Sequence, residues 1–406
     1  MNILVLTSSY PTAASETASP YVLELYEHLA REGHEVHVVL PHYPGGPSRE
    51  TRGGVHLHYF RYGPDSWETL CYGSGIPERI KRYWRYRLLF CLFLPCQFFA
   101  ALRLCLMRKV DVVSCHWLLS ALTGIMLKLV LRKPVALTIY GVELFMARRS
   151  GLLRKACEAI FPRVSALITI STPNMELFKA FDLGKARLEM IPVGPQTSIF
   201  TRGVTLDAMA PAKSFTRETG ARLLFVGRLV ERKGVVYLLR ALPELRKAMP
   251  GVVLDVVGDG PERDPLAQEA KRLGVDDIVR FHGFIPAKEL GKLYEQAEVF
   301  VFPSIVDSKG DTEGLGIVTF EAWVYGVPVV AGDVGGILDT VLDGRTGLLV
   351  PQKNAEAIAA AVLRLADEHG LSASLVARGQ DMLRTVFSWK SITKAHEDLF
   401  ESLRAR

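Results

Sequence analysis

The chain has few cysteines and none in a paired motif. All of them lie in the first half, and no two have the C-x-x-C spacing. A disulfide framework or a cysteine zinc site needs regular paired spacing, so both are excluded and reduced thiols in a cytoplasmic protein are expected. The six are Cys71, Cys91, Cys96, Cys105, Cys115 and Cys157.

A large surplus of one charge is also missing. The 406 residues carry 49 Lys and Arg against 43 Asp and Glu, a formal net charge of +6. A nucleic-acid binder would show a denser basic footprint, so no nucleic-acid partner is expected, whereas anionic ligands or a membrane surface remain compatible. His56 and His58 share one face of a strand by simple alternation, which does not indicate a metal site.

Long uninterrupted apolar runs are absent. The N-terminus enters "NILVLTSSYP" directly, which predicts a buried strand and not a signal peptide. Residues 79–109 join basic and aromatic residues to about fifteen apolar positions, but a membrane span needs about 20 and Pro95 interrupts this run. The segment either lies in a membrane interface or packs as an ordinary helix on its domain, and both hold if one face packs while the other docks. The expected location is the cytoplasm, peripheral to the inner face of the cytoplasmic membrane.

Neither half of the chain opens with G-x-G-x-x-G. The nearest stretch, "GDGPER", lacks the third glycine. This absence disfavours a dinucleotide-dependent oxidoreductase.

What the chain does have is a repeated alternation of short apolar runs and helical patterns. It begins with "ILVLTSSY" and "PYVLELYEHLAREG", and after an irregular stretch over 195–220 it restarts at "RLLFVGRL". Such alternation predicts α/β structure: two Rossmann-like doubly wound domains facing a central cleft, with ligands at the carboxyl ends of the strands. We expect an N-terminal domain over 1–196, a linker from about 195 to 220, a C-terminal domain over 197–387, and a last helix over 388–406 that returns to the first domain.

Two stretches of the second domain combine glycines with charge. In "FVGRLVERKG", Gly227 ends a strand and is followed by Arg228 and Lys233, two cations suited to a diphosphate, although a solvated basic turn gives the same pattern. In "DTEGLGIVTFEAWVYG", Glu313 and Glu321 lie eight positions apart at the start of a helix. There free backbone N–H groups favour phosphate, and carboxylates favour sugar and ribose hydroxyls. Glu321 taken alone would be a surface residue.

The motifs G-R-L…K-G, "VVGDGPER", "FHGFIP", "EGLGIVTFE" and "GGILDTVLDGRTGLLVP" follow one another in order. Together they resemble the nucleotide-sugar domain of retaining glycosyltransferases of family 4, which have the GT-B fold, over nearly all of 221–390. The first domain is more loosely similar through "DVVSCHW", "LTIYGVELF" and "IPVG". Tyr140 and Gln196 stand where that family usually has a histidine and an aspartate.

The resemblance implies roles for the residues of the donor site. Arg228 and Lys233, beside Gly227, match positions that hold the donor diphosphate in place of a metal ion. Glu313 matches the glutamate that binds the donor sugar, and Glu321 the one that holds the ribose.

Five further residues are implied. Gly314, Leu315 and Gly316 match the backbone turn under the sugar and phosphate, and Phe284 lies where the family reads the base. His116 matches an acceptor-side histidine that reaches the cleft, although a satisfied histidine at a strand end is the alternative. The predicted catalytic residues are then Glu313, His116, Arg228 and Lys233.

The implied reaction is retaining, metal-independent transfer to an acceptor hydroxyl, helped by fixed positive charge on the departing diphosphate and requiring no cofactor. The expected partners are a UDP- or GDP-sugar donor and a saccharide or lipid-linked acceptor of cell-surface polysaccharide or glycolipid synthesis. Two other hypotheses stay open, a GT-B nucleotide-sugar epimerase and a non-catalytic nucleotide-sugar-binding protein.

Overall fold

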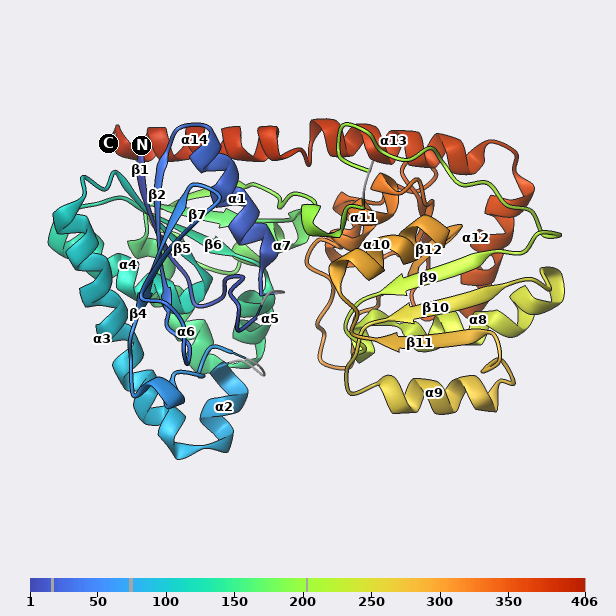
Figure 1. Cartoon of the computed structure of the whole chain (residues 1–406), viewed down its shortest axis with the longest axis horizontal. Coiled ribbons are helices and arrows are strands. Elements are labelled where there is room, and N and C mark those ends of the chain that lie inside the picture. The colour runs from blue at the N-terminus through green and yellow to red at the C-terminus, as the bar shows by residue number, and fades with distance from the viewer. Residues whose placement is uncertain (16–17, 73–75, 202–203, 406) are drawn as a thin grey trace. The chain divides into compact units, whose positions relative to one another are not determined.

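The structure is a computed structural model that describes residues 1–15, 18–72, 76–201 and 204–405 (Figure 1). It divides into two compact units. Unit 1 holds Met1–Ile170, Asn174–Gly194 and Trp389–Arg406, and unit 2 holds Ser171–Pro173 and Pro195–Ser388.

Unit 1 is built on an eight-stranded sheet in the order β3-β4-β2-β1-β5-β6-β7-β8. All neighbours pair in parallel except β3 and β4, which form an antiparallel hairpin at one edge. The central strands are apolar and buried on both faces, as parallel strands between helical layers must be. The strands are β1 (Asn2–Leu6), β2 (Glu35–Pro41), β3 (Arg49–Arg52), β4 (Val55–Phe60), β5 (Val112–His116), β6 (Val135–Ile139), β7 (Ala166–Thr169) and β8 (Arg187–Met190).

Helices cover this sheet, and the C-terminal helix is one of them. The chain ends in α14, which belongs to unit 1 and packs against α1 (Figure 1). This confirms the predicted return of the last helix to the first domain. The helices of unit 1 are α1 (Pro20–Arg31), α2 (Ile76–Arg82), α3 (Trp84–Met107), α4 (Trp117–Leu131), α5 (Val142–Arg149), α6 (Gly151–Ile160), α7 (Thr172–Phe178), whose first two residues are assigned to unit 2, and α14 (Trp389–Arg404). Short 3₁₀ turns lie at Asp65–Trp67 and Phe161–Arg163.

Helix α3 runs without a break through Pro95. One face packs into unit 1, where Phe93 contacts the rings of Phe60 and Tyr62 at centroid distances of 5.0 and 5.5 Å. The prediction that Pro95 interrupts this segment was therefore wrong, because the helix continues for 24 residues. By length and composition α3 could cross a membrane, although 39% of its apolar window is buried within the protein.

Unit 2 has a fully parallel six-stranded sheet in the order β11-β10-β9-β12-β13-β14. Together the two parallel-sheet units confirm the predicted fold class. The elements of unit 2 are β9 (Arg222–Val226), α8 (Val235–Ala248), β10 (Val253–Val257), α9 (Arg263–Arg272), β11 (Val279–Gly283), α10 (Ala287–Gln296), β12 (Val299–Phe302), α11 (Val318–Val324), β13 (Val329–Gly332), β14 (Leu348–Val350), α12 (Ala355–Asp367) and α13 (Leu371–Thr385), with 3₁₀ turns at Thr197–Ile199, Glu231–Lys233 and Gly335–Asp339.

The irregular stretch over 195–220 is part of unit 2 and not a free linker. The N–H of Ala210 donates to the carbonyl of Val324, the N–H of Lys213 donates to Gly326, and the Tyr325 hydroxyl donates to the carbonyl of Ile199. These contacts attach the stretch to the C-terminal end of α11 and to the turn that follows it. Arg202 and Gly203 of this stretch lie outside the described residues.

Candidate functional site

Three loops of unit 2 meet because the strands that carry them are neighbours. Strands β9, β12 and β13 lie side by side, so their carboxyl ends share one edge of the sheet. The loop after β9 carries Arg228 to Lys233, the loop after β12 carries Glu313, and the turn after β13 carries Gly335 and Gly336. The edge at which ligands bind in parallel sheets thus holds most of the predicted site.

Glu313 is bound by two cations of the first loop. Its Oε2 accepts hydrogen bonds from Lys233 Nζ at 2.6 Å and from Arg232 Nη1 at 2.8 Å. Lys233 Nζ also lies 4.3 Å from the centre of the Phe302 ring, a cation–π contact. Two positive charges around one carboxylate leave a local net charge of +1, which suits an anionic ligand.

The surroundings of this cluster change the pKa of both buried partners. Burial alone would raise the pKa of Glu313, but the Lys233 and Arg232 charges lower it below its ordinary value. Burial and the neighbouring Arg232 charge lower the pKa of Lys233, although Glu313 opposes this. The Glu313 carboxylate is therefore ionised. It lies in direct contact with the two cations and is not a separate binding group.

Arg228 and Phe284 remain on the surface. Arg228 is exposed, and its side chain forms no hydrogen bond or ion pair with other described residues. Phe284 follows β11 at the same edge of the sheet, and 70% of it is exposed. Sequence reasoning missed Arg232, which lies beside Glu313, because only Arg228 and Lys233 of this loop were predicted to belong to the site. The basic composition of "ERKG" was the only signal for it.

The turn at Gly314–Gly316 packs backbone against backbone on the loop after β13. The N–H of Gly336 donates to the carbonyl of Glu313 at 2.9 Å, and a Cβ on Gly336 would lie 1.9 Å from the carbonyl oxygen of Gly314. Only glycine fits there. In the described part of the chain, the N–H groups of Gly314, Leu315 and Gly316 donate to no acceptor, so three neighbouring donors are available.

Glu321 is buried. The sequence around it, taken alone, had suggested a surface residue. Glu321 is 4% exposed, and its Oε2 accepts a hydrogen bond from the Tyr294 hydroxyl at 2.8 Å. Burial raises the pKa of Glu321 to about 7, although the Tyr294 hydrogen bond opposes the rise. The ring of Tyr294 stacks on Tyr325 at 5.6 Å, which holds the hydroxyl in place.

His116, at the end of β5 in unit 1, has no exposed surface. Its Nε2 lies 2.6 Å from the Tyr26 hydroxyl and its Nδ1 lies 2.7 Å from the Tyr140 hydroxyl. Burial, with a smaller contribution from His396, lowers the pKa of His116 to about 3. The geometry agrees with a satisfied histidine at a strand end, the alternative reading, and not with a ring that reaches out of the unit.

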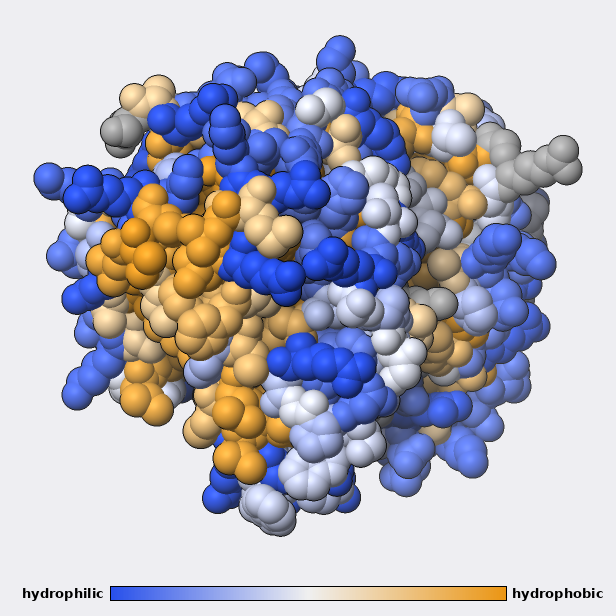
Figure 2. Space-filling view, turned by 60° about the vertical axis from the view of Figure 1, so that its left-hand side comes forward, coloured by the Kyte–Doolittle hydropathy of each residue, from blue (hydrophilic) through white to orange (hydrophobic). Residues whose placement is uncertain are grey.

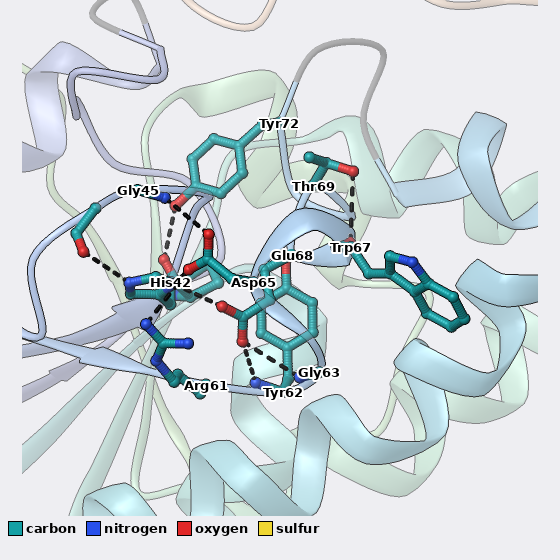
Figure 3. Close-up of polar contacts among 12 residues, drawn as sticks. His42, Gly45, Arg61, Tyr62, Gly63, Asp65, Trp67, Glu68, Thr69 and Tyr72 are labelled. Carbon is teal, nitrogen blue, oxygen red and sulfur yellow. Dashed lines mark hydrogen bonds and ion pairs between the residues drawn. The ribbon is translucent and has the colours of Figure 1, made fainter.

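One group of side chains in the described residues is close enough to hold a metal ion: His42, Asp65 and Glu68 of unit 1, whose ligand atoms lie within 4.8 Å of one another (Figure 3). However, His42 Nδ1 lies 2.5 Å from Glu68 and Nε2 lies 2.9 Å from the carbonyl of Gly46. Both ring nitrogens therefore already have hydrogen-bond partners within the protein. Glu68 also accepts from the backbone N–H groups of Tyr62 and Gly63. The cluster therefore joins the segment after β2 to the loop after β4 and has a structural role.

Two family models match the chain. "Glycosyl transferases group 1" matches residues 209–382, and "Glycosyl transferase 4-like domain" matches residues 16–194. They divide between the two halves of the chain, and the first spans the whole candidate site.

Individual relatives agree with these matches. An uncharacterized glycosyltransferase of Methanocaldococcus jannaschii is 28% identical over 99% of this chain and 98% of its own. A GDP-mannose-dependent alpha-(1-6)-phosphatidylinositol monomannoside mannosyltransferase of Mycolicibacterium smegmatis is 41% identical over 47% of this chain and 52% of its own. Among solved structures, a sucrose-phosphate synthase from Thermosynechococcus elongatus is similar in fold, with a TM-score of 0.76 and 24% identity over 100% of this chain and 99% of that chain.

Proposed function

The chain belongs to the group 1 glycosyltransferases of the GT-B fold, and from that premise we propose that it transfers a sugar from a nucleotide-sugar donor to an acceptor hydroxyl with retention of configuration. The observation that carries the proposal is the convergence of Lys233, Arg232 and Glu313 with the free N–H groups of the Gly314–Gly316 turn. Cations, amides and a carboxylate at one sheet edge match a donor that joins a diphosphate to a hydroxyl-rich sugar.

In the proposed binding mode, the diphosphate lies against Lys233 and the amides of the turn. Arg228, exposed and unpaired among the described residues, swings onto the same oxygens. Glu313 accepts hydrogen bonds from the sugar hydroxyls, and its contacts with Lys233 and Arg232 reduce its repulsion of the phosphates. Glu321 accepts from the ribose hydroxyls, and Phe284 lies beside the base.

The reaction then breaks the bond between the anomeric carbon and the phosphate oxygen. The acceptor oxygen bonds to that carbon on the same face, and its proton passes to the departing diphosphate. Fixed cations stabilise the charge that develops on the leaving oxygen, in the role that a metal ion plays in other transferases, so we propose metal-independent catalysis without a cofactor.

We propose a saccharide or lipid-linked acceptor of cell-surface polysaccharide or glycolipid synthesis, used at the cytoplasmic face of a membrane. The support is the mycobacterial relative, which is named as a phosphatidylinositol monomannoside mannosyltransferase. His116 would contribute to transfer only through the tyrosines that it holds, because its ring has no exposed surface.

A thermal-shift screen of UDP- and GDP-sugars tests the proposal, because a ligand that binds only the folded state raises its stability. The stabilising donor is then incubated with the protein and saccharide or lipid acceptors, and the anomeric configuration of the product is read by NMR. Stabilisation followed by formation of a retained glycoside is expected. Conversion of the donor sugar to its epimer without an acceptor would instead indicate an epimerase, and binding without any turnover would indicate a non-catalytic nucleotide-sugar-binding protein.

A further inference from the structure

Unit 1 exposes a broad apolar face on α3 and α4. These helices pack against each other, and Figure 2, turned so that this side of Figure 1 comes forward, shows large hydrophobic areas there. On α3 the stripe Trp84, Leu88, Leu92, Phe99 and Leu106 repeats at helical spacing. The exposed large apolar residues of the two helices, with their exposed fractions, are Trp84 72%, Leu88 50%, Leu92 43%, Phe99 66%, Leu106 71%, Met107 60%, Leu122 39%, Met126 40%, Leu129 77% and Val130 59%.

The exposed side of α3 is unusual because it is apolar although the helix already packs its other side into unit 1. The opposite side of α3 is also apolar, and Leu89, Phe93 and Ala101 are buried in the core of unit 1. A helix that packs on one side normally carries polar residues on the other. An exposed apolar patch of this extent marks a contact with a membrane or a protein.

The chain segment that forms the face carries almost only positive charge. Residues 79–133 include eleven Lys and Arg and a single acidic residue, Asp111. The Asp111 carboxylate already accepts from the backbone N–H of Asn2 and pairs with Arg404. Basic residues beside exposed leucines and a tryptophan complement an anionic bilayer, whose headgroups attract cations while its acyl region accepts apolar side chains.

Within this basic region, Arg79 and Arg85 converge on one atom. Arg79 donates to the Tyr86 hydroxyl at 2.7 Å, and Arg85 donates to the same oxygen at 3.3 Å. Both guanidiniums lie over the Tyr86 ring, at 5.3 and 5.0 Å from its centre. In the described residues neither forms an ion pair, and the buried Nε atom of each has no acceptor.

The two guanidinium charges repel each other, and the neutral Tyr86 hydroxyl between them does not offset that repulsion. A bound anion would offset it, because it attracts both charges. They also change the phenol: burial by itself raises the pKa of Tyr86, but hydrogen bonds from Thr69 and Arg85 and the two arginine charges bring it below its ordinary value. Phosphate oxygens, like carboxylate oxygens, accept paired hydrogen bonds from guanidiniums, and phosphate is the anion that lipid headgroups present at a bilayer surface. This cluster adjoins Trp84, where the apolar stripe begins.

We propose that unit 1 docks on an anionic bilayer through the exposed face of α3 and α4, and that Arg79 and Arg85 bind a lipid headgroup phosphate there. The inference extends the membrane acceptor of the proposed function. The proposed membrane binding takes place without a bound donor and does not depend on sugar transfer.

Co-sedimentation of the full chain with vesicles tests the proposal. We expect binding to vesicles of phosphatidylglycerol in phosphatidylcholine and not to phosphatidylcholine alone. Arg79→Gln/Arg85→Gln should lower the partition coefficient about thirtyfold, from about 1 kcal/mol per basic residue at a charged surface. Trp84→Ser/Phe99→Ser should lower it at least tenfold. The matched control, Arg378→Gln/Arg384→Gln, removes the same charge from two exposed arginines of α13 and should bind as the unaltered chain does.

Further variants and a soluble ligand separate the remaining explanations. Arg79→Lys/Arg85→Lys keeps the charge without paired donors; it should bind more weakly than the unaltered chain but better than the Gln variant, and it serves if the Gln variant unfolds. Glycerol 1-phosphate, a headgroup without acyl chains, should stabilise the protein far less than vesicles do. Equal binding to both vesicle types, equal loss in the α13 control, or tight binding of glycerol 1-phosphate that ignores Trp84 and Phe99 would overturn the proposal. Because the assay contains no donor, its failure would leave the proposed transfer standing, and loss of donor binding would leave vesicle binding intact.

Discussion

Lys233 and Glu313 form an ion pair between two loops of unit 2, with Nζ 2.6 Å from Oε2 across 80 positions of sequence. The pair is largely buried, with side-chain exposures of 8% and 13%. Both residues were predicted to touch the donor, one at the phosphates and one at the sugar. The structure shows them in contact with each other. In the proposed binding mode the diphosphate would therefore share Lys233 with Glu313, and the pair would couple recognition of the two halves of the donor.

Lys233→Ala is expected to weaken the binding of nucleoside diphosphates by about 10- to 100-fold, because a charge-assisted hydrogen bond contributes about 1.5–3 kcal/mol. It also leaves Glu313 with Arg232 as its one cation, which should lower the thermal unfolding midpoint. Calorimetric titration with UDP and GDP measures the first effect. Lys247→Ala, at an exposed position of α8, is the matched control and should change neither quantity. Unchanged nucleotide affinity in Lys233→Ala would contradict the site assignment.

The two arginines of the same loop should differ in what they affect. Arg228 is exposed and unpaired among the described residues, so Arg228→Ala should reduce nucleotide affinity about tenfold without changing stability. Arg232 supports Glu313 at 2.8 Å, so Arg232→Ala should lower stability by about 1–2 kcal/mol and raise the pKa of Glu313. Denaturant unfolding paired with nucleotide titration separates the two. If Arg228→Ala leaves affinity unchanged while Arg232→Ala abolishes it, Arg232 and not Arg228 holds the diphosphate.

Much of this arrangement could be predicted from the sequence because it depends on local patterns. Buried parallel strands are continuous apolar runs, and the turns that follow them carry glycine and charge. The strands β9 and β12 and the loop positions of Lys233 and Glu313 could therefore be predicted. The side chains that contact these and the other site residues could not be predicted. Arg232 and Glu313 are 81 positions apart, and Tyr294 and Glu321 come from different helices, so their contacts depend on how loops and helices pack. No local pattern reveals that His116 is enclosed by tyrosines of α1 and the β6 end.

His116→Ala is expected to act first on folding. The change leaves the hydroxyls of Tyr26 and Tyr140 without their buried partner and opens a cavity, which together should lower the free energy of unfolding by about 2–4 kcal/mol. Because burial holds the pKa of His116 to about 3, its ring is neutral at physiological pH and should add no inflection to the pH–rate profile near neutrality. Nucleotide binding by unit 2 should be unchanged. A stable His116→Ala protein that binds donor but has lost transfer would restore the acceptor-side role that the sequence suggested.

Glu321 should make stability and donor binding respond to pH in opposite directions. Its pKa is raised from 4.5 to about 7 in the folded protein, so between these values the unfolded chain has lost a proton that the folded chain keeps. The free energy of unfolding therefore falls as pH rises through this window, by at most about 3 kcal/mol, and Glu321→Gln should lack that part of the slope. Urea unfolding of both proteins at about pH 5 and about pH 8 measures the difference. Glu143, whose pKa burial also raises to about 7, is present in both and cancels.

Donor affinity should show the reverse trend, because ribose hydroxyls donate to the ionised carboxylate and not to the protonated acid. In the unaltered protein, the affinity for the nucleoside diphosphate should fall as pH drops below about 7, while the bound ribose itself favours release of the proton from Glu321. Glu321→Gln should bind more weakly at about pH 8 and change little between about pH 8 and about pH 6. Nucleotide titrations across this range in both proteins provide the check. Parallel curves would show that the pH dependence comes from another group and that Glu321 supports α10 through Tyr294 without contacting the ribose.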